Sequence, residues 1–172
     1  PFADWPQDLA AHVSGRVVMA AGGHEYDGRP FMPLNEFDVR QAAKTFQDEG
    51  IDSVAIVAVF SPLTSECEER AAEILRAVSP DIKLTLSHNL GRVGLLEREN
   101  AALLNASLRR LAESTTLAFT EALDTSGIEA PLYLTQNDGT VMRAGQAEAF
   151  PVYSFSSGPT NSMRGAAHLS GL

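Results

Sequence analysis

Hydrophobic and polar positions change their period several times along this 172-residue chain, and each change predicts a different element. Over residues 34–50, apolar side chains recur at helical spacing between Asn35, a good N-cap, and Gly50, a common helix stop. Residues 54–60 instead form an unbroken, largely β-branched run, which is typical of a strand buried on both faces of a parallel sheet. Residues 83–87 predict a second strand.

A helix is predicted between these two strands. Ser65 and Glu68 have the spacing of a capping box, and apolar residues continue at helical spacing from there to Ser79. Two strands joined by a helix of this length predict a right-handed crossover with parallel strands. The longest helical pattern follows at 95–123, with a weak point where hydroxyl residues 114–116 lower the helix propensity.

The remaining segments predict shorter elements. We expect a small hairpin within 16–32, turning at Asp27-Gly28, and a third sheet strand at 132–135. The last elements are a short helix at 145–150, a strand at 152–155 and a closing helix at 161–169. Together these elements predict one α/β domain over 1–172, a mixed, mainly parallel sheet with flanking helices. An N-terminal arm and hairpin occupy 1–33 and the α/β core occupies 34–172.

Composition argues against several kinds of binding partner and predicts the compartment. A formal net charge of -9 disfavours nucleic acid and anionic membranes as partners, because both are bound by clustered basic residues. A single cysteine, Cys67, cannot form an internal disulfide, and no apolar run is long enough to span a bilayer, so we expect a cytoplasmic protein. The chain begins with proline instead of methionine, and we expect it to be an internal piece of a longer subunit.

Candidate chemistry gathers where the predicted strands end. If all three strands are parallel, their carboxyl ends share one edge, which would carry Ser61, His88 and the segment Gln136, Asn137, Asp138. Ligands of open α/β sheets bind along that edge. Glu97 and Arg98 would lie close to His88. Ordinary turn formation explains the same residues equally well, because serine, asparagine and aspartate favour turns.

A second candidate precedes the closing helix. Its members are Ser157, Gly158, Pro159, Asn161 and Ser162, which would offer hydroxyls and backbone N–H groups to an anion at a helix N-terminus. A plain N-cap with a tight turn is the alternative. The four histidines do not have the spacing of metal ligands, so no metal site is expected within the chain.

Several motifs, in matching order, resemble the hydantoinase/oxoprolinase family, and within it the A subunit of hydantoin utilisation proteins (N-methylhydantoinase A). The resemblance covers nearly everything after Arg16. The motifs are Pro33-Leu34-Asn35-Glu36, residues 58–62, Glu68-Glu69-Arg70, Leu86-Ser87-His88, Glu97-Arg98-Glu99-Asn100, residues 104–108, Gln136-Asn137-Asp138-Gly139-Thr140 and Ser157-Gly158-Pro159.

This resemblance implies an actin-like ATPase fold (ribonuclease H-like) in which a cleft between two domains binds ATP and Mg²⁺. It implies an ATP-dependent enzyme that opens a small cyclic amide such as a hydantoin or 5-oxoproline. The partner would be a B subunit, in a homo- or hetero-oligomer. Relatives within the family carboxylate ketones such as acetone or acetophenone, and this activity remains an alternative. A non-catalytic assembly domain is a third possibility.

The sequence departs from the family pattern at the phosphate-binding turns. The family carries Asp-x-Gly-Gly-Thr turns near its N-terminus and after the Ser-Gly-Pro segment, and neither occurs in this sequence. The resemblance therefore implies that these 172 residues do not hydrolyse ATP alone. It places the cleft-lining residues at 136–140, including Gly139 and Thr140, and at 157–162, and it assigns no catalytic residue.

Overall fold

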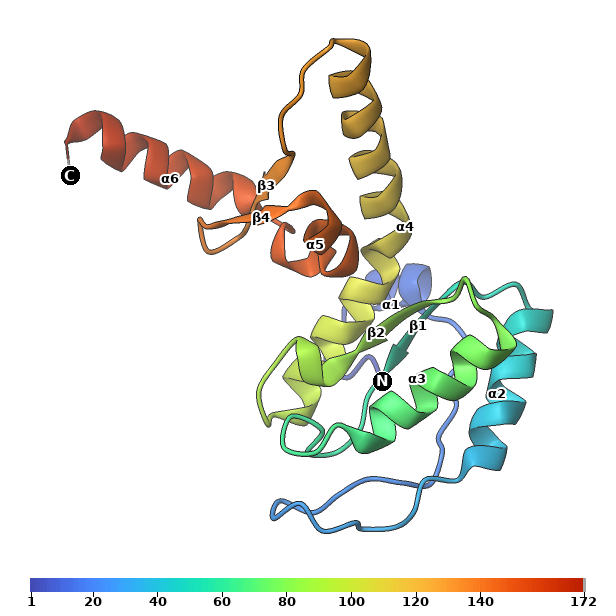
Figure 1. The fold of residues 1–172 in the computed structure, drawn as a ribbon. Coiled ribbons are helices and arrows are strands. Elements are labelled where there is room, and N and C mark those ends of the chain that lie inside the picture. The colour runs from blue at the N-terminus through green and yellow to red at the C-terminus, as the bar shows by residue number, and fades with distance from the viewer. Residues whose placement is uncertain (172) are drawn as a thin grey trace. The chain divides into compact units, whose positions relative to one another are not determined.

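The computed structural model describes residues 1–171 and divides the chain into two compact units, Pro1–Ser107 and Leu108–Leu172. The sequence predicted a single domain. The division falls within one long helix, and a continuous helical pattern carries no information about which of its parts pack together. Figure 1 shows the elements of each unit.

The first unit is built on a parallel strand pair. Strands β1 (Ser53–Ile56) and β2 (Lys83–Leu86) pair in parallel, with Ser53 opposite Lys83. Helix α3 (Glu66–Val78) connects them, and α2 (Glu36–Asp48) packs beside α3 (Figure 1). The predicted βαβ unit is therefore confirmed, but β1 ends four residues early because 57–60 turn away from the sheet.

The two faces of β2 contact different kinds of side chains, apolar on one face and polar on the other. Leu84 and Leu86 point into the apolar core against α2 and α3, where Ala43, Phe46 and Leu75 are also buried. Thr85 lies between these two leucines, so its side chain points to the opposite face of the strand. There it accepts a hydrogen bond from Asn105 (3.0 Å). The period of two along β2 thus separates an apolar layer from a polar one.

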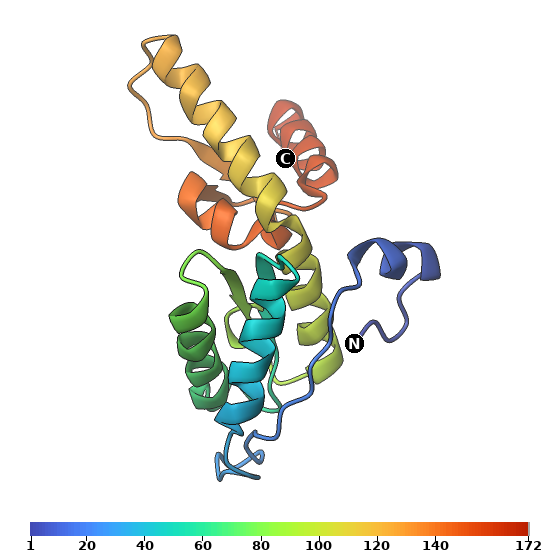
Figure 2. The same cartoon turned by 90° about the vertical axis from the view of Figure 1, so that its right-hand side faces the viewer.

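Helix α4 (Leu95–Thr125) covers the second face with its first turns (Figure 2). Arg98, Ala102 and Asn105 recur at helical spacing and are buried. Ser53 of β1 also donates to the Ala106 carbonyl oxygen of α4 (2.7 Å). The predicted weak point at 114–116 does not interrupt the helix, and the Thr116 hydroxyl donates to the Ala112 carbonyl oxygen within it (2.8 Å).

The N-terminal segment carries one short helix, α1 (Gln7–Val13), and Trp5 donates from its indole to Asn100 (2.9 Å). The hairpin predicted within 16–32 is present only in part. The chain turns at Asp27-Gly28 as predicted, with the Gly28 N–H donating to the Glu25 carbonyl oxygen (3.0 Å), but the pairing is reduced to one antiparallel bridge between His24 and Pro30. Proline has no N–H to extend the ladder, and Gly23, at φ +120°, departs from strand geometry.

The second unit has its own small sheet. Strand β3 (Tyr133–Thr135) pairs antiparallel with β4 (Val141–Arg143), followed by α5 (Ala144–Ala149), a 3₁₀ turn at Pro151–Tyr153 and α6 (Ser157–Ser170). Two predictions fail here. The third strand does not join β1 and β2, because Gly139, at φ +85°, turns the chain back into a hairpin. The strand predicted at 152–155 is replaced by the 3₁₀ turn, which Pro151 opens.

Candidate functional site

A buried carboxylate organises the carboxyl ends of β1 and β2. Glu68 lies on the inner face of α3 and is fully buried. Its Oε1 accepts from the backbone N–H of Ala58 (2.9 Å), which follows β1. Its Oε2 accepts from the backbone N–H of His88 (3.0 Å), which follows β2. One side chain thus holds both strand ends.

Glu68 does not form the capping box predicted with Ser65, whose side chain makes no cap hydrogen bond. Glu68 instead shares one helical face with Ala71, Ala72 and Leu75, all buried. That spacing was visible in the sequence: an acidic residue in register with the apolar stripe of a helix is a candidate for a buried functional group. The prediction of a capping box assigned Glu68 to the exposed helix start, so its buried position was not recognised.

Two hydroxyls and a histidine complete the contacts of Glu68. Ser87 Oγ donates to Glu68 Oε1 (2.5 Å) and lies 3.3 Å from Ser61 Oγ. His88 Nδ1 lies 2.8 Å from Glu68 Oε2, and His88 Nε2 lies 3.3 Å from Glu69 Oε1. Ser61 and Ser87 are buried, whereas the His88 side chain keeps 14% of its surface exposed. The histidine therefore lies at the border between the buried cluster and solvent.

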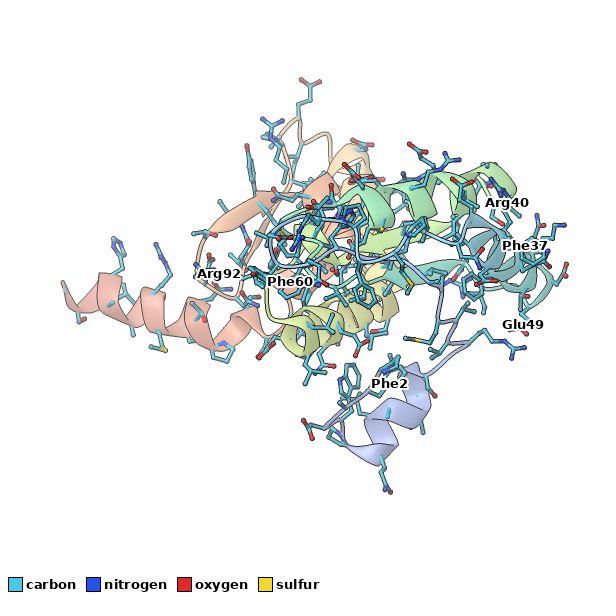
Figure 3. All side chains as sticks on the ribbon, turned by 90° about the horizontal axis from the view of Figure 1, so that it is seen from below. Phe2, Phe37, Arg40, Glu49, Phe60 and Arg92 are labelled. Atoms are coloured by element: carbon cyan, nitrogen blue, oxygen red, sulfur yellow. The ribbon has the colours of Figure 1, made fainter. Side chains whose placement is uncertain are left out.

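Arg98 closes the cluster from α4. Its Nε donates to Ser87 Oγ (2.9 Å), and its terminal nitrogens donate to the carbonyl oxygens of Ala58 and of residues 92–94. Burial lowers the pKa of the Arg98 guanidinium, and the nearby Glu68 charge acts in the opposite direction. Arg98 thus ties together the loops that contain Phe60 and Arg92, both labelled in Figure 3.

A hollow of about 270 Å³ lies beside this cluster. It is lined by Leu90, Gly91, Arg92, Gly94, Glu97 and Arg98. Gly94 leaves room for the Glu97 carboxylate, since an added Cβ would lie 2.5 Å from Glu97 Oε2. The structure therefore brings Ser61, His88, Glu97 and Arg98 to one edge of the first unit.

The other candidates form a separate cluster in the second unit. Thr160 Oγ1 donates to the Asn137 carbonyl oxygen (2.7 Å), and Asn161 Nδ2 donates to Thr135 Oγ1 (2.8 Å). Gln136 follows β3 and pairs across the turn, its N–H donating to the Thr140 carbonyl oxygen (2.8 Å). These residues do not share a sheet with Ser61 and His88, because β3 belongs to the second sheet.

The turn at 136–140 is already satisfied internally. Thr140 donates to Asp138 Oδ1 from its hydroxyl (2.7 Å) and its N–H (2.8 Å). The hydrogen bonds from Thr140 lower the pKa of Asp138, and the Arg164 charge contributes less. The N–H of Asn137 donates to the Tyr153 carbonyl oxygen (2.6 Å). The N–H groups of 137 and 140 are therefore engaged within the chain.

The segment 157–162 lies within α6, not ahead of a helix. Helix α6 begins at Ser157, four residues before the predicted start, so Gly158 and Pro159 occupy its first turn and Ser162 lies exposed on its second. Ser156 precedes it at φ 59° and makes no side-chain cap hydrogen bond. Proline in the first helical turn explains the early start, because its missing N–H needs no partner there.

Within residues 1–171, no three His, Cys, Asp or Glu side chains gather closely enough to hold a metal ion. The turn that the resemblance assigned to a nucleotide cleft uses its amides internally. Over the same residues, no helix has the length and apolar character needed to cross a membrane.

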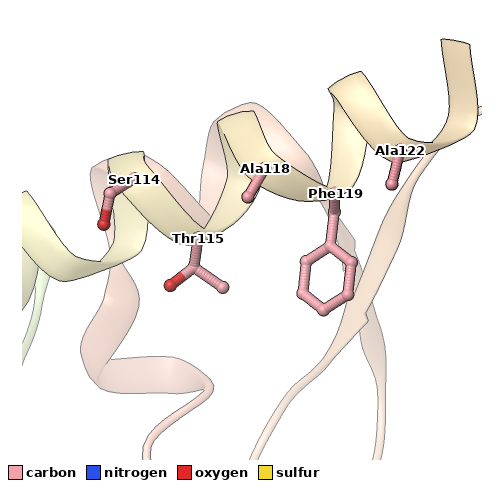
Figure 4. Close-up of a pocket in the computed structure, with 5 residues that line it drawn as sticks. All are labelled: Ser114, Thr115, Ala118, Phe119 and Ala122. Atoms are coloured by element: carbon pink, nitrogen blue, oxygen red, sulfur yellow. The ribbon is translucent and has the colours of Figure 1, made fainter. Parts of the chain in front are cut away.

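A second hollow, of about 460 Å³, lies along α4 in the second unit (Figure 4). It is lined by Ser114, Thr115, Ala118, Phe119 and Ala122. None of these side chains titrates near neutral pH, so the hollow cannot supply a general acid or base.

Comparison with known proteins matches both parts of the chain. Residues 5–79 match the hydantoinase/oxoprolinase N-terminal region, and residues 98–172 match the hydantoinase/oxoprolinase family proper. Among curated proteins, the caprolactamase alpha subunit of Pseudomonas jessenii is 24% identical over 91% of this chain. The acetophenone carboxylase gamma subunit of Aromatoleum aromaticum is 25% identical over 95%. The chain spans 22% of the length of either relative.

Solved structures share the fold. The crystal structure of the ATP-dependent caprolactamase from Pseudomonas jessenii matches 81% of this chain and 20% of its own, with a TM-score of 0.76 at 24% identity. Nucleotide-free acetone carboxylase matches 88% of this chain and 22% of its own, with a TM-score of 0.65 at 19% identity. Mixed helices and strands in the same arrangement are thus common to these proteins.

Proposed function

Since the chain belongs to the hydantoinase/oxoprolinase family, we propose that it is part of an ATP-dependent enzyme that opens a cyclic amide. The observation that carries this proposal is the cluster of Glu68, Ser87, His88 and Arg98 at the carboxyl ends of parallel strands, where α/β proteins bind ligands. The caprolactamase match supports the substrate class, since caprolactam is a cyclic amide.

The chemistry requires an activated carbonyl. A lactam carbonyl is a poor electrophile, and phosphorylation of its oxygen would make the carbon reactive enough for water to add. The tetrahedral intermediate would then expel the ring nitrogen, which breaks the C–N bond and takes up a proton, and a second water would release phosphate from the resulting acyl phosphate. ATP with Mg²⁺ would supply that phosphoryl group from a cleft completed outside these residues, in an actin-like ATPase fold. We therefore propose that the 172 residues alone are inactive. Within them, the Glu68–His88 edge would orient the ring, and residues 136–140 and 157–162 would border the nucleotide cleft.

Ketone carboxylation is the second candidate. Acetophenone carboxylase matches this chain at an identity close to that of caprolactamase, and acetone carboxylase shares the fold. Both matched curated proteins are named as subunits, so we propose a partner subunit of the B type and an oligomer of either kind. We propose a cytoplasmic location for the complex.

The test measures ATP hydrolysis by the complete subunit that contains these residues, with its partner. The added compounds are ε-caprolactam, hydantoin, N-methylhydantoin, 5-oxoproline, and acetone with bicarbonate. Stimulation by a cyclic amide supports the proposal and identifies the substrate, and stimulation by acetone with bicarbonate alone supports the carboxylase. Stimulation by none of them refutes both activities and favours the assembly domain.

A pair of histidine variants adds a residue-level test. His88→Asn should reduce the stimulated rate at least tenfold, whereas His168→Asn, on exposed α6, should leave it unchanged. Equal rates for both variants and the wild type would show that the Glu68–His88 edge does not contact the substrate.

A further inference from the structure

The second unit buries few apolar side chains. Among its described residues, 108–171, Met142 and Ala147 are the only buried hydrophobic residues, and both clusters that form an apolar core lie in the first unit. Large apolar side chains of the second unit are exposed instead: Leu111, Leu117, Phe119, Ile128, Tyr133, Val141, Phe155, Met163 and Leu169. Exposed apolar side chains gathered in one unit mark a surface that other protein covers.

The distal part of helix α4, residues 111–125, is the clearest case. Among the described elements of the second unit, close packing is confined to β3, β4, α5 and the 3₁₀ turn at Pro151–Tyr153. Of residues 117–125, all except Leu123 are exposed. The hollow of about 460 Å³ lies along this part of α4, on the side of Phe119 (Figure 4). A helical segment of this length is only marginally stable in water unless it packs against other protein.

The exposed side chains of the distal part project in more than one direction. An α-helix turns by about 100° per residue, so Leu117 and Phe119 lie about 200° apart around α4. Leu117 is 57% exposed and Phe119 is 51% exposed. A partner that docks on one face of the helix would cover only one of them. Covering both requires protein on opposite sides of the helix.

A layer from the same polypeptide meets this requirement better than a second copy of the chain. The chain spans 22% of the length of the matched caprolactamase and acetophenone carboxylase subunits. A complete subunit of that length would supply most of its residues from outside this chain. A second copy in a two-fold interface would meet a single face of α4, and two copies with a net charge of -9 each would repel one another.

We infer that the distal part of α4 is an interior helix of the complete subunit. Polypeptide from outside these 172 residues fills the hollow beside Phe119 and also covers Leu117 on the other side of the helix. The occupant is thus an apolar part of the same subunit. This inference rests on the proposal that the chain belongs to a longer subunit, but not on the reaction which that subunit catalyses.

Hydroxyl-radical labelling of the complete subunit, read by mass spectrometry, tests the inference through the accessibility of single side chains. Phe119 and Phe46 form a matched pair with the same intrinsic reactivity, and Phe46 is 6% exposed within the first unit. We expect the two to label at rates within about threefold of each other, because a close-packed interior excludes the radical from both. Leu117 should match the buried Leu75 in the same way. Faster labelling of Phe119 or of Leu117 than this limit would overturn the inference.

The labelling also identifies the occupant when it is repeated over about a fiftyfold dilution and with the partner subunit added. Protection of Phe119 and Leu117 in the subunit alone, unchanged by dilution, supports the inference. Protection that disappears on dilution would identify a second copy. Protection that appears only with the partner subunit would identify that partner. Either of these two results would overturn the inference.

A pair of glutamate variants covers the case of an oligomer that dilution does not separate. Phe119→Glu should lower the midpoint of thermal unfolding of the complete subunit by at least about 3 °C without changing the particle mass measured by light scattering. Gln41→Glu, at an exposed position of α2, should change neither. A stable Phe119→Glu variant of reduced particle mass would show an interface between copies and overturn the inference. If that variant does not fold, the wild-type labelling decides.

Neither measurement reads turnover. A result against the interior helix therefore leaves the proposed reaction in place. Failure of every compound to stimulate ATP hydrolysis would likewise leave the labelling result in place, so the two failures are distinguishable.

Discussion

Replacing Arg98 with methionine would leave Glu68 buried without its nearest positive charge. Arg98 is 1% exposed and Glu68 is 0% exposed, so water cannot take over the lost contacts without opening the cluster. Arg98 and Glu68 do not contact each other directly, but both bond to Ser87 Oγ and their charges attract across it. Leaving a buried charged group without its partner in such a network costs about 3 kcal/mol. The carbonyl oxygens of 92–94 add little, since these residues are exposed and can bond to water.

This cost is large relative to the total free energy of unfolding. Domains of this size are stable by about 5–15 kcal/mol, so Arg98→Met should remove a substantial share of the free energy of unfolding of the first unit. Glu68→Gln should cost a comparable amount, because it removes the negative charge that stabilises the buried Arg98 guanidinium. In the double variant both charges are gone, and the two costs should not add. We expect a coupling energy of about 2 kcal/mol or more.

Urea unfolding followed by tryptophan fluorescence measures these energies. Trp5 is the only tryptophan, and its indole donates to Asn100 within the first unit, so the signal reports on that unit. Two results would refute the argument that the charges depend on each other. One is a free energy of unfolding for Arg98→Met within about 1 kcal/mol of wild type. The other is a cost of the double variant that equals the sum of the two single-variant costs within about 0.5 kcal/mol.

Three smaller perturbations have defined outcomes. Asn35→Ala should cost about 1 kcal/mol in the same urea assay, because the side chain accepts from two backbone N–H groups at the start of α2. Gly139→Ala should cost about 1–3 kcal/mol in thermal unfolding, since φ is +85° and the new Cβ would lie 2.4 Å from an α6 side chain, whereas Gly165→Ala, with open space around it, should not destabilise. The lowered pKa of Asp138 means that its contacts stabilise the turn above the ordinary value of 3.8 and are lost as pH falls through the lowered pKa. Thr140→Val should raise the Asp138 pKa in an NMR titration, and an unchanged pKa would contradict the assigned cause.

Local patterns predicted the elements that local physics controls. Helix α2 begins after Asn35 as predicted, because capping depends on the neighbouring backbone N–H groups alone. The parallel pair β1 and β2 followed from two apolar runs and the helix between them. Prediction failed where the structure depends on which distant strand pairs with a segment. The segment at 132–135 is a strand, but nothing in its residues identifies β4 instead of β2 as its neighbour.

The candidate site shows the same contrast between what neighbouring residues predict and what distant partners decide. Ser61 and His88 were predicted to share an edge because both follow strands of one βαβ unit, and the structure places them around Ser87. Residues 136–138 were assigned to that edge only through the incorrect third strand. Glu68 was missed because the capping-box spacing and the buried-face spacing coincide at the same residue.

The sequence by itself determined the family, the helices and the parallel crossover, because motif order and hydrophobic period are properties of neighbouring residues. Only the tertiary structure decided that Glu68 turns inward and that Arg98 provides its countercharge from α4. Such a choice depends on the balance between desolvation of a charge and the hydrogen bonds available inside. That balance exists only once α3, β2 and α4 have come together, from segments separated by as many as thirty positions.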